Sequence, residues 1–234
     1  MTASSQTTLD RYGESLRRRD RIGWVIVRST VVGAAKLWFR YEVHGRENLP
    51  ADNAFILSPV HRSNLDTPLL PVIRREQIRF MGKESLWKVN PFASWFLTIM
   101  GGFPVEREAV DRSAMAAAEG ILARGETLVM LPEGTRRSGP IVQAENMHDG
   151  PSFVSGRTQV PIVPVGIADT EAAMPIGTKF IYPKKLVFVI GEPIAPPEQN
   201  EKGRVPRRAV KEHTEHLRQQ LQELYDEAKV IRGP

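Results

Sequence analysis

The sequence contains no cysteine. Disulfide bonds, thiolate metal sites, cysteine nucleophiles and acyl-cysteine intermediates are therefore excluded. A run of about 18 uncharged apolar residues is also lacking. The longest candidate, Val89 to Val105, is interrupted by prolines and glycines, so we expect no polytopic membrane protein. The first residues show no basic stretch followed by an apolar one, and we expect no secretory signal.

Low-complexity composition is absent as well. Of the 234 residues, 41% are hydrophobic and 25% are charged, which is typical of a globular protein and excludes a mainly disordered or collagenous chain. The length is best explained by one large domain.

Acidic residues are scarce near the N-terminus. Residues 1–40 carry eight basic and three acidic side chains, and they account for the whole formal net charge of +5. Their apolar residues recur at helical spacing. A basic and apolar helix favours an anionic membrane surface as its partner, whereas the alternative is a helix that packs on its own domain. We expect no nucleic-acid partner, because the rest of the chain has no basic stripe. The apolar stripe consists of Trp24, Val27, Val31, Ala34 and Trp38.

Strand-like and helical segments alternate after residue 45. We expect an α/β fold, a single layered domain with a mixed, largely parallel central sheet flanked by helices, plus N-terminal amphipathic membrane-docking helices. The predicted division is 1–45 for the basic helical segment and 46–234 for the layered domain. Pro164 gives one strand an edge or bulged character. The expected strands are 54–60, 77–83, 103–106, 127–131, 161–168, 180–182 and 185–191, and the expected helices are 68–75, 91–100, 111–124 and 204–229.

Several common catalytic motifs do not occur. We find no phosphate-binding G-x-x-x-x-G-K-[ST], no G-x-G-x-x-G, no H-E-x-x-H and no G-x-S-x-G. His213 and His216 lie three residues apart in the last predicted helix. We expect them to be solvated surface residues rather than metal ligands.

The stretch from His61 to Asp66 directly follows the predicted strand 54–60. Five residues apart in a regular helix, the two side chains would diverge by about 140°. They can meet only across a turn, and Ser63 and Asn64 favour one. Asp66 would then accept a hydrogen bond from one imidazole nitrogen and leave the other able to take a proton. On its own, the pair is explained more simply as a turn histidine with a capping aspartate.

Three later stretches are further candidates for a functional site. Residues 101–107 join two glycines to Arg107, which can bind an oxyanion. Residues 131–139 place Glu133 and Arg136 at a glycine turn after an apolar strand, and residues 160–165 are an uncharged apolar run. Taken singly, these stretches suit a surface arginine, a polar loop and a core strand.

Together, the four stretches resemble the four ordered blocks of the glycerolipid acyltransferase family, of the lysophosphatidate acyltransferase type. Those blocks are H-x-x-x-x-D, glycine-aromatic-x-x-x-R, E-G-T-R and V-P-[IV]-[VI]-P-V. All four occur here in that order, over about residues 55–168, with no departure at the key positions. Met81-Gly82-Lys83 also resembles a glycine-lysine step of that family.

The resemblance implies that the domain 46–234 transfers a fatty acyl group from acyl-CoA or acyl carrier protein to the hydroxyl of 1-acyl-glycerol 3-phosphate. It implies that His61 is the general base, that Asp66 orients it, and that Arg107 and Arg136 bind the acceptor phosphate. It also implies that Glu133 hydrogen-bonds the acceptor or orients those two arginines. It implies no metal and no organic cofactor. The other substrate-binding residues it implies are Glu133, Gly134, Thr135 and Lys83, with backbone amides near Gly134 as candidate oxyanion donors.

Lipid substrates connect this chemistry with the basic N-terminal segment. We expect a peripheral protein on the cytoplasmic face of the cell membrane, with an anionic membrane surface, the thioester donor and a lysophospholipid acceptor as partners. Residues 89–103 are either a second apolar docking face, a wall for the acyl chain or a core helix. Two alternatives stay open: acyl transfer to glycerol 3-phosphate or another lysophospholipid, and a catalytically silent membrane adaptor.

Overall fold

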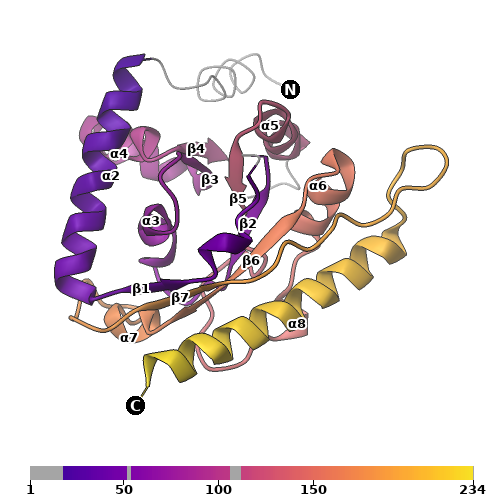
Figure 1. Cartoon of the computed structure of the whole chain (residues 1–234). Coiled ribbons are helices and arrows are strands. Elements are labelled where there is room, and N and C mark those ends of the chain that lie inside the picture. The colour runs from indigo at the N-terminus through magenta and orange to yellow at the C-terminus, as the bar shows by residue number, and fades with distance from the viewer. Residues whose placement is uncertain (1–17, 52–53, 106–111, 234) are drawn as a thin grey trace.

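A mixed sheet of seven strands lies at the centre of the computed structural model, which describes residues 18–51, 54–105 and 112–233 (Figure 1). The strand order is β1-β7-β6-β2-β5-β3-β4. The five strands from β6 to β4 are parallel, whereas β7 runs antiparallel to β6 and β1 runs parallel to β7. The predicted fold class is therefore confirmed. The strands are β1 Glu42–His44, β2 Ile56–Pro59, β3 Ile78–Lys83, β4 Gly102–Val105, β5 Thr127–Val129, β6 Ile162–Ala168 and β7 Val187–Ile190.

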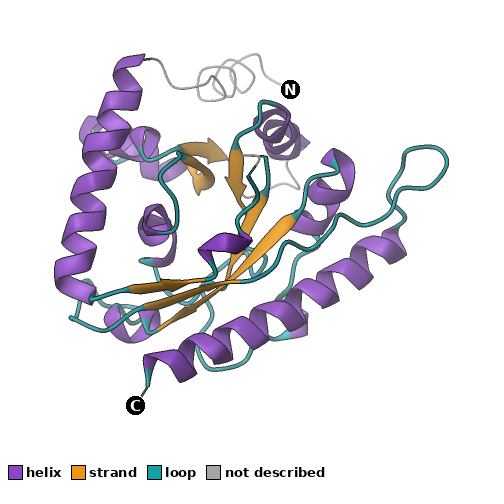
Figure 2. Cartoon of the chain, in the orientation of Figure 1, coloured by secondary structure: helices purple, strands orange, loops and turns teal. Residues whose placement is uncertain are grey.

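Helices cover both faces of this sheet (Figure 2). The long C-terminal helix α8 crosses one face and packs on β6 and β7, where Leu217 and Leu221 are fully buried. A Cβ on Gly166 in β6 would lie 2.3 Å from backbone atoms of Leu224, so only glycine allows this close approach. The described helices are α2 Arg18–Phe39, α3 Asp66–Leu69, α4 Pro91–Ile99, α5 Arg112–Ala123, α6 Gly150–Thr158, α7 Thr170–Ala173 and α8 Arg207–Arg232.

Three predicted elements differ from the structure. The predicted helix 68–75 begins earlier, as α3, and continues as a 3-10 turn over Leu70–Val72. The predicted strand 180–182 is an exposed loop. The strand that contains Pro164 is not at an edge, because β6 lies between β7 and β2. Its pairing with β7 is interrupted opposite the proline: three residues separate Ile190 from Ile194, whereas two separate their partners on β6, so the bulged character is confirmed.

Helix α2 is apolar on more than one side. Trp24, Ala35 and Phe39 are buried against the body of the protein, and the Trp24 indole N–H donates to the backbone oxygen of Arg75 at 3.2 Å. The helix therefore packs on its own domain. The buried side differs from the predicted stripe, since Ala34 and Trp38 are exposed.

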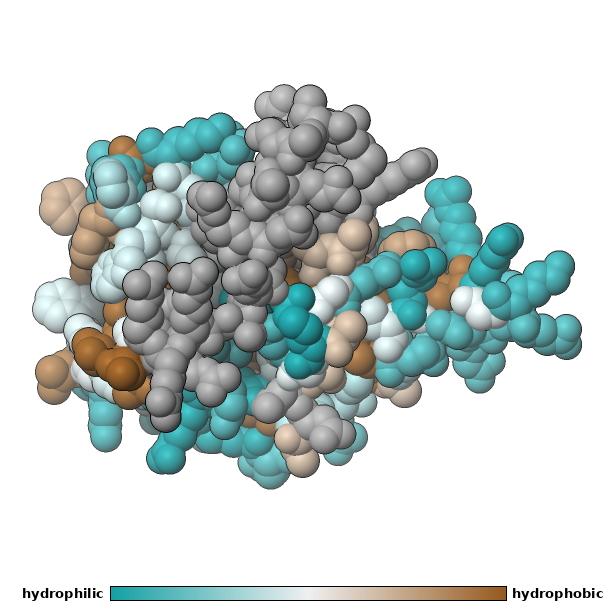
Figure 3. All heavy atoms as spheres, turned by 90° about the horizontal axis from the view of Figure 1, so that it is seen from above, coloured by the Kyte–Doolittle hydropathy of each residue, from teal (hydrophilic) through white to brown (hydrophobic). Residues whose placement is uncertain are grey.

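The opposite side of α2 faces outward and is also hydrophobic, with Ile22, Val25, Ile26, Leu37 and Trp38 exposed. Apolar residues gather on the side of the molecule where α2 and α4 lie (Figure 3). Among the described residues, one helical stretch, Ile22–Phe39, is long and apolar enough to cross a membrane, by length and composition alone. This window is not predicted from an uncharged apolar run, because Arg28 and Lys36 interrupt it.

The end of the segment 1–45 is part of the sheet. Strand β1 pairs with β7, with Glu42 opposite Val187 and His44 opposite Val189. The described part of the predicted N-terminal segment is thus attached to the layered domain by strand pairing as well as by helix packing. The division at residue 45 stays a prediction.

The predicted position of His213 on the helix surface is wrong. His213 lies inside, with Nδ1 2.9 Å from the Ser152 hydroxyl and Nε2 3.0 Å from the Ala195 backbone oxygen. A backbone oxygen only accepts, so Nε2 carries the hydrogen and Nδ1 accepts from Ser152 in the neutral ring. His216 is exposed, as predicted.

Burial gives the protein a pH-dependent stability at His213. Desolvation lowers the pKa of His213 below its usual value. Below about pH 6.5 the unfolded chain binds a proton that the folded protein disfavours, so stability falls as the pH falls from there toward the lowered pKa. We expect the melting temperature to drop between about pH 7 and pH 5 and His213→Gln to weaken this dependence, measured by differential scanning fluorimetry. An unchanged slope in that variant contradicts the assignment, and His44→Gln, at an exposed histidine on β1, is the control.

Candidate active site

The candidate residues follow neighbouring parallel strands at one edge of the sheet. His61 lies two residues after the end of β2, Glu133 follows β5, and Lys83 is the last residue of β3. Neighbouring strands lie about 4.8 Å apart, so these chain ends form a row. After β2 the chain forms β3, β4 and β5 on one side of that strand and then crosses to β6 on its other side. Such a switch point is where open α/β sheets bind ligands.

His61 and Asp66 meet across the predicted turn. The chain bends at Ser63 and turns at Asn64 and Leu65, which brings His61 Nδ1 to 2.9 Å from Asp66 Oδ2. The same oxygen accepts the backbone N–H groups of Arg62 and Ser63, both at 2.7 Å. Since a carboxylate only accepts, Nδ1 carries the hydrogen and Nε2 has a free lone pair.

The environment of the two side chains differs in a way that suits a base and its orienting group. Asp66 is fully buried, whereas the His61 side chain is 14% exposed. The carboxylate is thus fixed by three donors in the interior, and the imidazole keeps access to the surface. This arrangement can hold one tautomer of the ring and take up a proton at Nε2.

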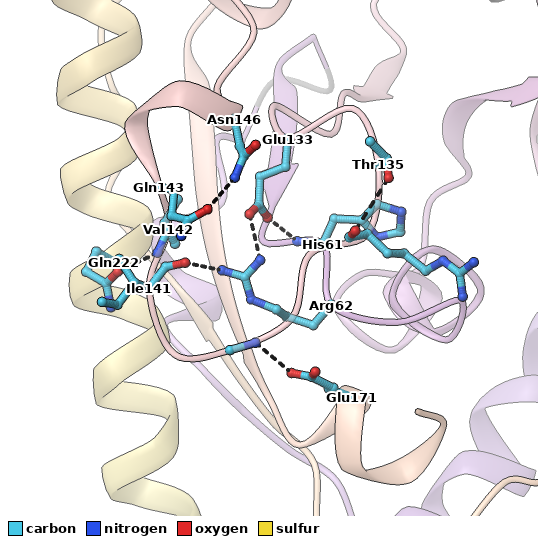
Figure 4. A network of polar contacts seen from close by, with 12 residues as sticks. His61, Arg62, Glu133, Thr135, Ile141, Val142, Gln143, Asn146, Glu171 and Gln222 are labelled. Atoms are coloured by element: carbon cyan, nitrogen blue, oxygen red, sulfur yellow. Dashed lines mark hydrogen bonds and ion pairs between the residues drawn. The ribbon is translucent and has the colours of Figure 1, made fainter. Parts of the chain in front are cut away.

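Glu133 binds the main chain of residues 61–66, the candidate catalytic turn, from the neighbouring strand end. Its Oε2 accepts the backbone N–H of His61 at 2.7 Å, and its Oε1 accepts from Arg62 Nη1 at 2.6 Å (Figure 4). Glu133 is fully buried and Arg62 is 1% exposed. Both carboxylate oxygens are therefore engaged within the protein, and the geometry favours a positioning role for Glu133 over contact with a substrate.

The loop after β5 also holds His61 from its other side. The backbone N–H of Arg137 donates to the His61 backbone oxygen at 2.9 Å. Gly134 has φ +64°, and a Cβ there would lie 2.8 Å from the ring of His148. Only glycine suits this position, and the turn it makes places Arg136 next to the residue that bonds to His61.

Of the remaining predicted residues, those that the structure describes lie at the same edge, and their side chains form no hydrogen bond to His61. Arg136 is half-buried, and Thr135 and Lys83 are exposed. Lys83 pairs in register with Val105, the end of β4. Arg107 lies outside the described residues. The N–H groups of Gly134 and Thr135 donate to the oxygens of Leu131 and Glu133, which does not support them as oxyanion donors. In the part of the chain that the structure describes, no group of three acidic or histidine side chains can hold a metal ion.

Sequence reasoning missed Arg62. Besides Glu133, its guanidinium donates to the Ile141 backbone oxygen at 3.3 Å and lies 5.1 Å from the ring centroid of Tyr225 on α8. Arg62 therefore joins the candidate catalytic turn, the loop after β5 and the last helix. It occupies an unspecified position of H-x-x-x-x-D, and no sequence pattern marks it.

Comparisons with known proteins agree with this geometry. The family model described as Acyltransferase matches residues 40–168, more than half of the chain. The 1-acyl-sn-glycerol-3-phosphate acyltransferase of Bacillus subtilis (strain 168) is 30% identical over 185 residues, which are 78% of this chain and 87% of that protein. The chloroplastic 1-acyl-sn-glycerol-3-phosphate acyltransferase BAT2 of Brassica napus is 28% identical, over 63% of this chain and 45% of that protein.

A solved structure is similar over nearly the whole chain. The crystal structure of the 1-acyl-sn-glycerophosphate (LPA) acyltransferase PlsC from Thermotoga maritima superimposes with a TM-score of 0.70 at 26% identity. The similarity covers 94% of this chain and 87% of that one. With a histidine and an aspartate joined at the carboxyl edge of the same kind of sheet, this chain belongs to the acyltransferase family.

Proposed function

We propose that this protein transfers a fatty acyl group from an acyl-CoA or acyl carrier protein thioester to the free hydroxyl of 1-acyl-glycerol 3-phosphate, giving phosphatidate. The observation that carries the proposal is the 2.9 Å contact between His61 Nδ1 and the buried Asp66, which leaves Nε2 as a base at the site edge. The acceptor is the one named for the curated relatives.

The chemistry needs a base and no enzyme nucleophile. Nε2 of His61 takes the proton of the acceptor hydroxyl as its oxygen attacks the thioester carbon. The negative charge of Asp66 stabilises the imidazolium that forms. As the carbon–sulfur bond breaks, the imidazolium returns the proton to the leaving thiolate. The products are an ester and a free thiol, and His61 is neutral again.

Cationic groups at the same edge of the sheet suit the acceptor phosphate. Arg136 and Lys83 are proposed ligands from this edge, and Arg107 is proposed from the resemblance to the family's blocks alone. Two guanidinium groups on one phosphate would fix the hydroxyl relative to His61. The turn from Glu133 to Arg137 supports this role for Arg136, because it is bonded to His61 at both ends.

Release of free thiol from acyl-CoA tests the activity directly. We expect release that depends on added acceptor, with 1-acyl-glycerol 3-phosphate preferred over glycerol 3-phosphate and over lysophospholipids that lack a terminal phosphate. A parallel assay with acyl carrier protein identifies the donor. Thiol release without any acceptor preference, or none with either donor, contradicts the proposal.

Arg136→Lys should weaken acceptor binding. Lysine keeps the charge but cannot form two parallel hydrogen bonds to a phosphate, and a bond to a charged group contributes about 1.5–3 kcal/mol. We expect the acceptor KM to rise about tenfold or more, with a smaller change in kcat and in the donor KM. Steady-state kinetics with each substrate varied measures this. Arg204→Lys, at an exposed arginine, is the control, and an unchanged acceptor KM in Arg136→Lys removes the residue from the site.

Helix α2 is proposed to dock the protein on the membrane rather than cross it. Its outward side is apolar, while Trp24 and Arg28 on the other side donate to backbone oxygens of the body. A helix held in this way has one side for lipid, as interfacial helices do. On α4, Phe92 and Trp95 are exposed and Ile99 is buried, so this helix is suited to both docking and core packing. The proposed placement is peripheral, on the cytoplasmic face, where the thioester donors are.

A further inference from the structure

A basic and apolar segment between α7 and β7 is exposed without being used by the site. Residues 175–185 form no strand, and they contain three lysines and no acidic residue. The Phe180 side chain is 76% exposed. A contiguous patch of exposed apolar side chains usually marks a site of contact with a protein or a membrane. The other exposed apolar members of the segment are Ile176, Ile181 and Tyr182.

The segment begins beside the catalytic turn. Helix α7 follows the carboxyl end of β6, at the same edge of the sheet as His61. Met174, directly before the segment, accepts a hydrogen bond from the Ser63 hydroxyl at 3.0 Å. Ser63 is one of the residues whose backbone N–H binds Asp66. The first residue of the segment is therefore one position from a direct contact with the catalytic turn.

The segment ends at the C-terminal end of α2. The backbone N–H of Leu186 donates to the Phe39 oxygen at 3.3 Å, and Lys185 Nζ lies 2.9 Å from Glu42. At this end of α2, Leu37 is 88% exposed and Trp38 is exposed too. Figure 1 shows α7 next to the C-terminal end of α2. The apolar outward side of α2 and the segment thus adjoin each other.

The charge of this combined surface is positive. Lys179 and Lys184 in the segment and Lys36 and Arg40 at the end of α2 are exposed. Glu42, the acidic residue at this place, is paired with Lys185. Exposed aromatic and aliphatic side chains among exposed lysines are complementary to an anionic bilayer surface. There, aromatic rings settle at the level of the headgroups and lysines contact lipid phosphates.

We propose that residues 175–185 and the C-terminal end of α2 form one contact surface for anionic lipid bilayers, beside the candidate active site. The role of this surface for catalysis rests on the proposed function, since it places the site edge against the membrane that holds the acceptor. The docking itself is measured without any acyl transfer, so the two proposals fail separately.

A single-cysteine probe tests the contact, because the chain has no cysteine of its own. Phe180→Cys, labelled with an environment-sensitive fluorophore, should brighten and shift to the blue with vesicles of phosphatidylcholine and phosphatidylglycerol, and should respond much less to phosphatidylcholine alone. Lys202→Cys is the control. It is exposed in the loop after Ile194, which pairs with the first residue of β6, so it lies at the opposite edge of the sheet.

A charge variant tests the electrostatic part. One lysine near an anionic surface changes the affinity about fivefold, so Lys179→Gln with Lys184→Gln should weaken vesicle binding about 25-fold. Lys202→Gln with Arg204→Gln removes the same charge from the opposite edge, and we expect a change below about twofold. Acyl transfer to acceptor dispersed in detergent should be unchanged in both double variants.

Three results overturn the proposal. The first is a labelled Phe180→Cys that stays dark on vesicles while the same label at Leu37→Cys responds. The second is equal vesicle affinity of the two double variants. The third is a brightening that follows protein concentration without vesicles, which assigns the segment to a second copy of the chain. If acyl transfer fails while vesicle binding is intact, the proposed function is refuted and the proposed contact surface is still supported.

Discussion

His61→Ala is expected to lower kcat by about 10²–10⁴, the usual contribution of a positioned general base. The imidazole is replaceable in structural terms, because its backbone rather than its ring carries the contacts to Glu133 and Arg137. Among the described residues, the ring forms one hydrogen bond, to Asp66. We therefore expect the melting temperature to change little while turnover collapses. Thiol release and scanning fluorimetry on the same preparation measure both.

Asp66→Asn separates the charge of the carboxylate from its shape. The amide oxygen can still accept from the backbone N–H groups of Arg62 and Ser63, so the turn should persist. The imidazolium would lose its counter-charge. The same aspartate-to-asparagine replacement in a Ser-His-Asp triad lowers kcat by a factor of about 10⁴. A large loss in both variants with the fold intact supports the assignment. His216→Ala, at an exposed histidine on α8, should retain full activity. Near-normal turnover in His61→Ala or Asp66→Asn contradicts the role of the pair.

The contact between His61 and Asp66 was predictable from sequence because its cause is local. A histidine after a buried strand, residues that favour turns, and an aspartate five positions on leave few ways for the side chains to meet. The contact between Glu133 and the backbone of His61 was not predictable in the same way. It joins residues that are 72 positions apart in the sequence. It forms because β2 and β5 are neighbours in the sheet, and the order of the strands is not visible in the local sequence pattern.

The differences between the predicted and the observed elements have a common physical origin. The run at 180–182 has the aromatic and β-branched residues of a strand, but β7 and β1 already complete that side of the sheet. Pro164 suggested an edge because it lacks an N–H, and the structure instead accommodates it opposite residues 191–193, where the ladder to β7 is interrupted. In both cases the local preference was interpreted correctly and the tertiary neighbours decided the outcome.

Glu133 shows how a motif can name a residue without naming its partner. The E-G-T-R block suggested a residue that touches the acceptor or orients arginines. In the structure it orients a guanidinium, but that of Arg62, which it contacts inside the protein at 2.6 Å. Pairing explains how a carboxylate and a guanidinium are both buried, since an isolated charge in the interior is costly.

Arg62→Met is consequently expected to be the most destabilising single substitution at the site. Methionine is similar in length and apolar, so it removes the charge while filling most of the space. Glu133 would remain buried without its counter-ion, and breaking a buried ion pair in this way costs about 3–5 kcal/mol. For a chain of 234 residues this corresponds to a fall in melting temperature of roughly 10 °C. Activity should fall as well, because Glu133 positions the His61 backbone.

A double-mutant cycle distinguishes the ion pair from general damage to the core. Glu133→Gln alone should also destabilise, since its amide N–H₂ would face the Arg62 guanidinium. In Arg62→Met with Glu133→Gln no uncompensated charge is left, and the double variant should be less destabilised than the sum of the single variants. Free energies of unfolding from urea titration measure the coupling. Additive effects would mean that the two side chains contribute independently, and Glu133 would then have to be reconsidered as a direct ligand of the acceptor. A clear coupling, together with loss of turnover in all three variants, would establish that the E-G-T-R glutamate acts on the acceptor through the backbone that carries His61.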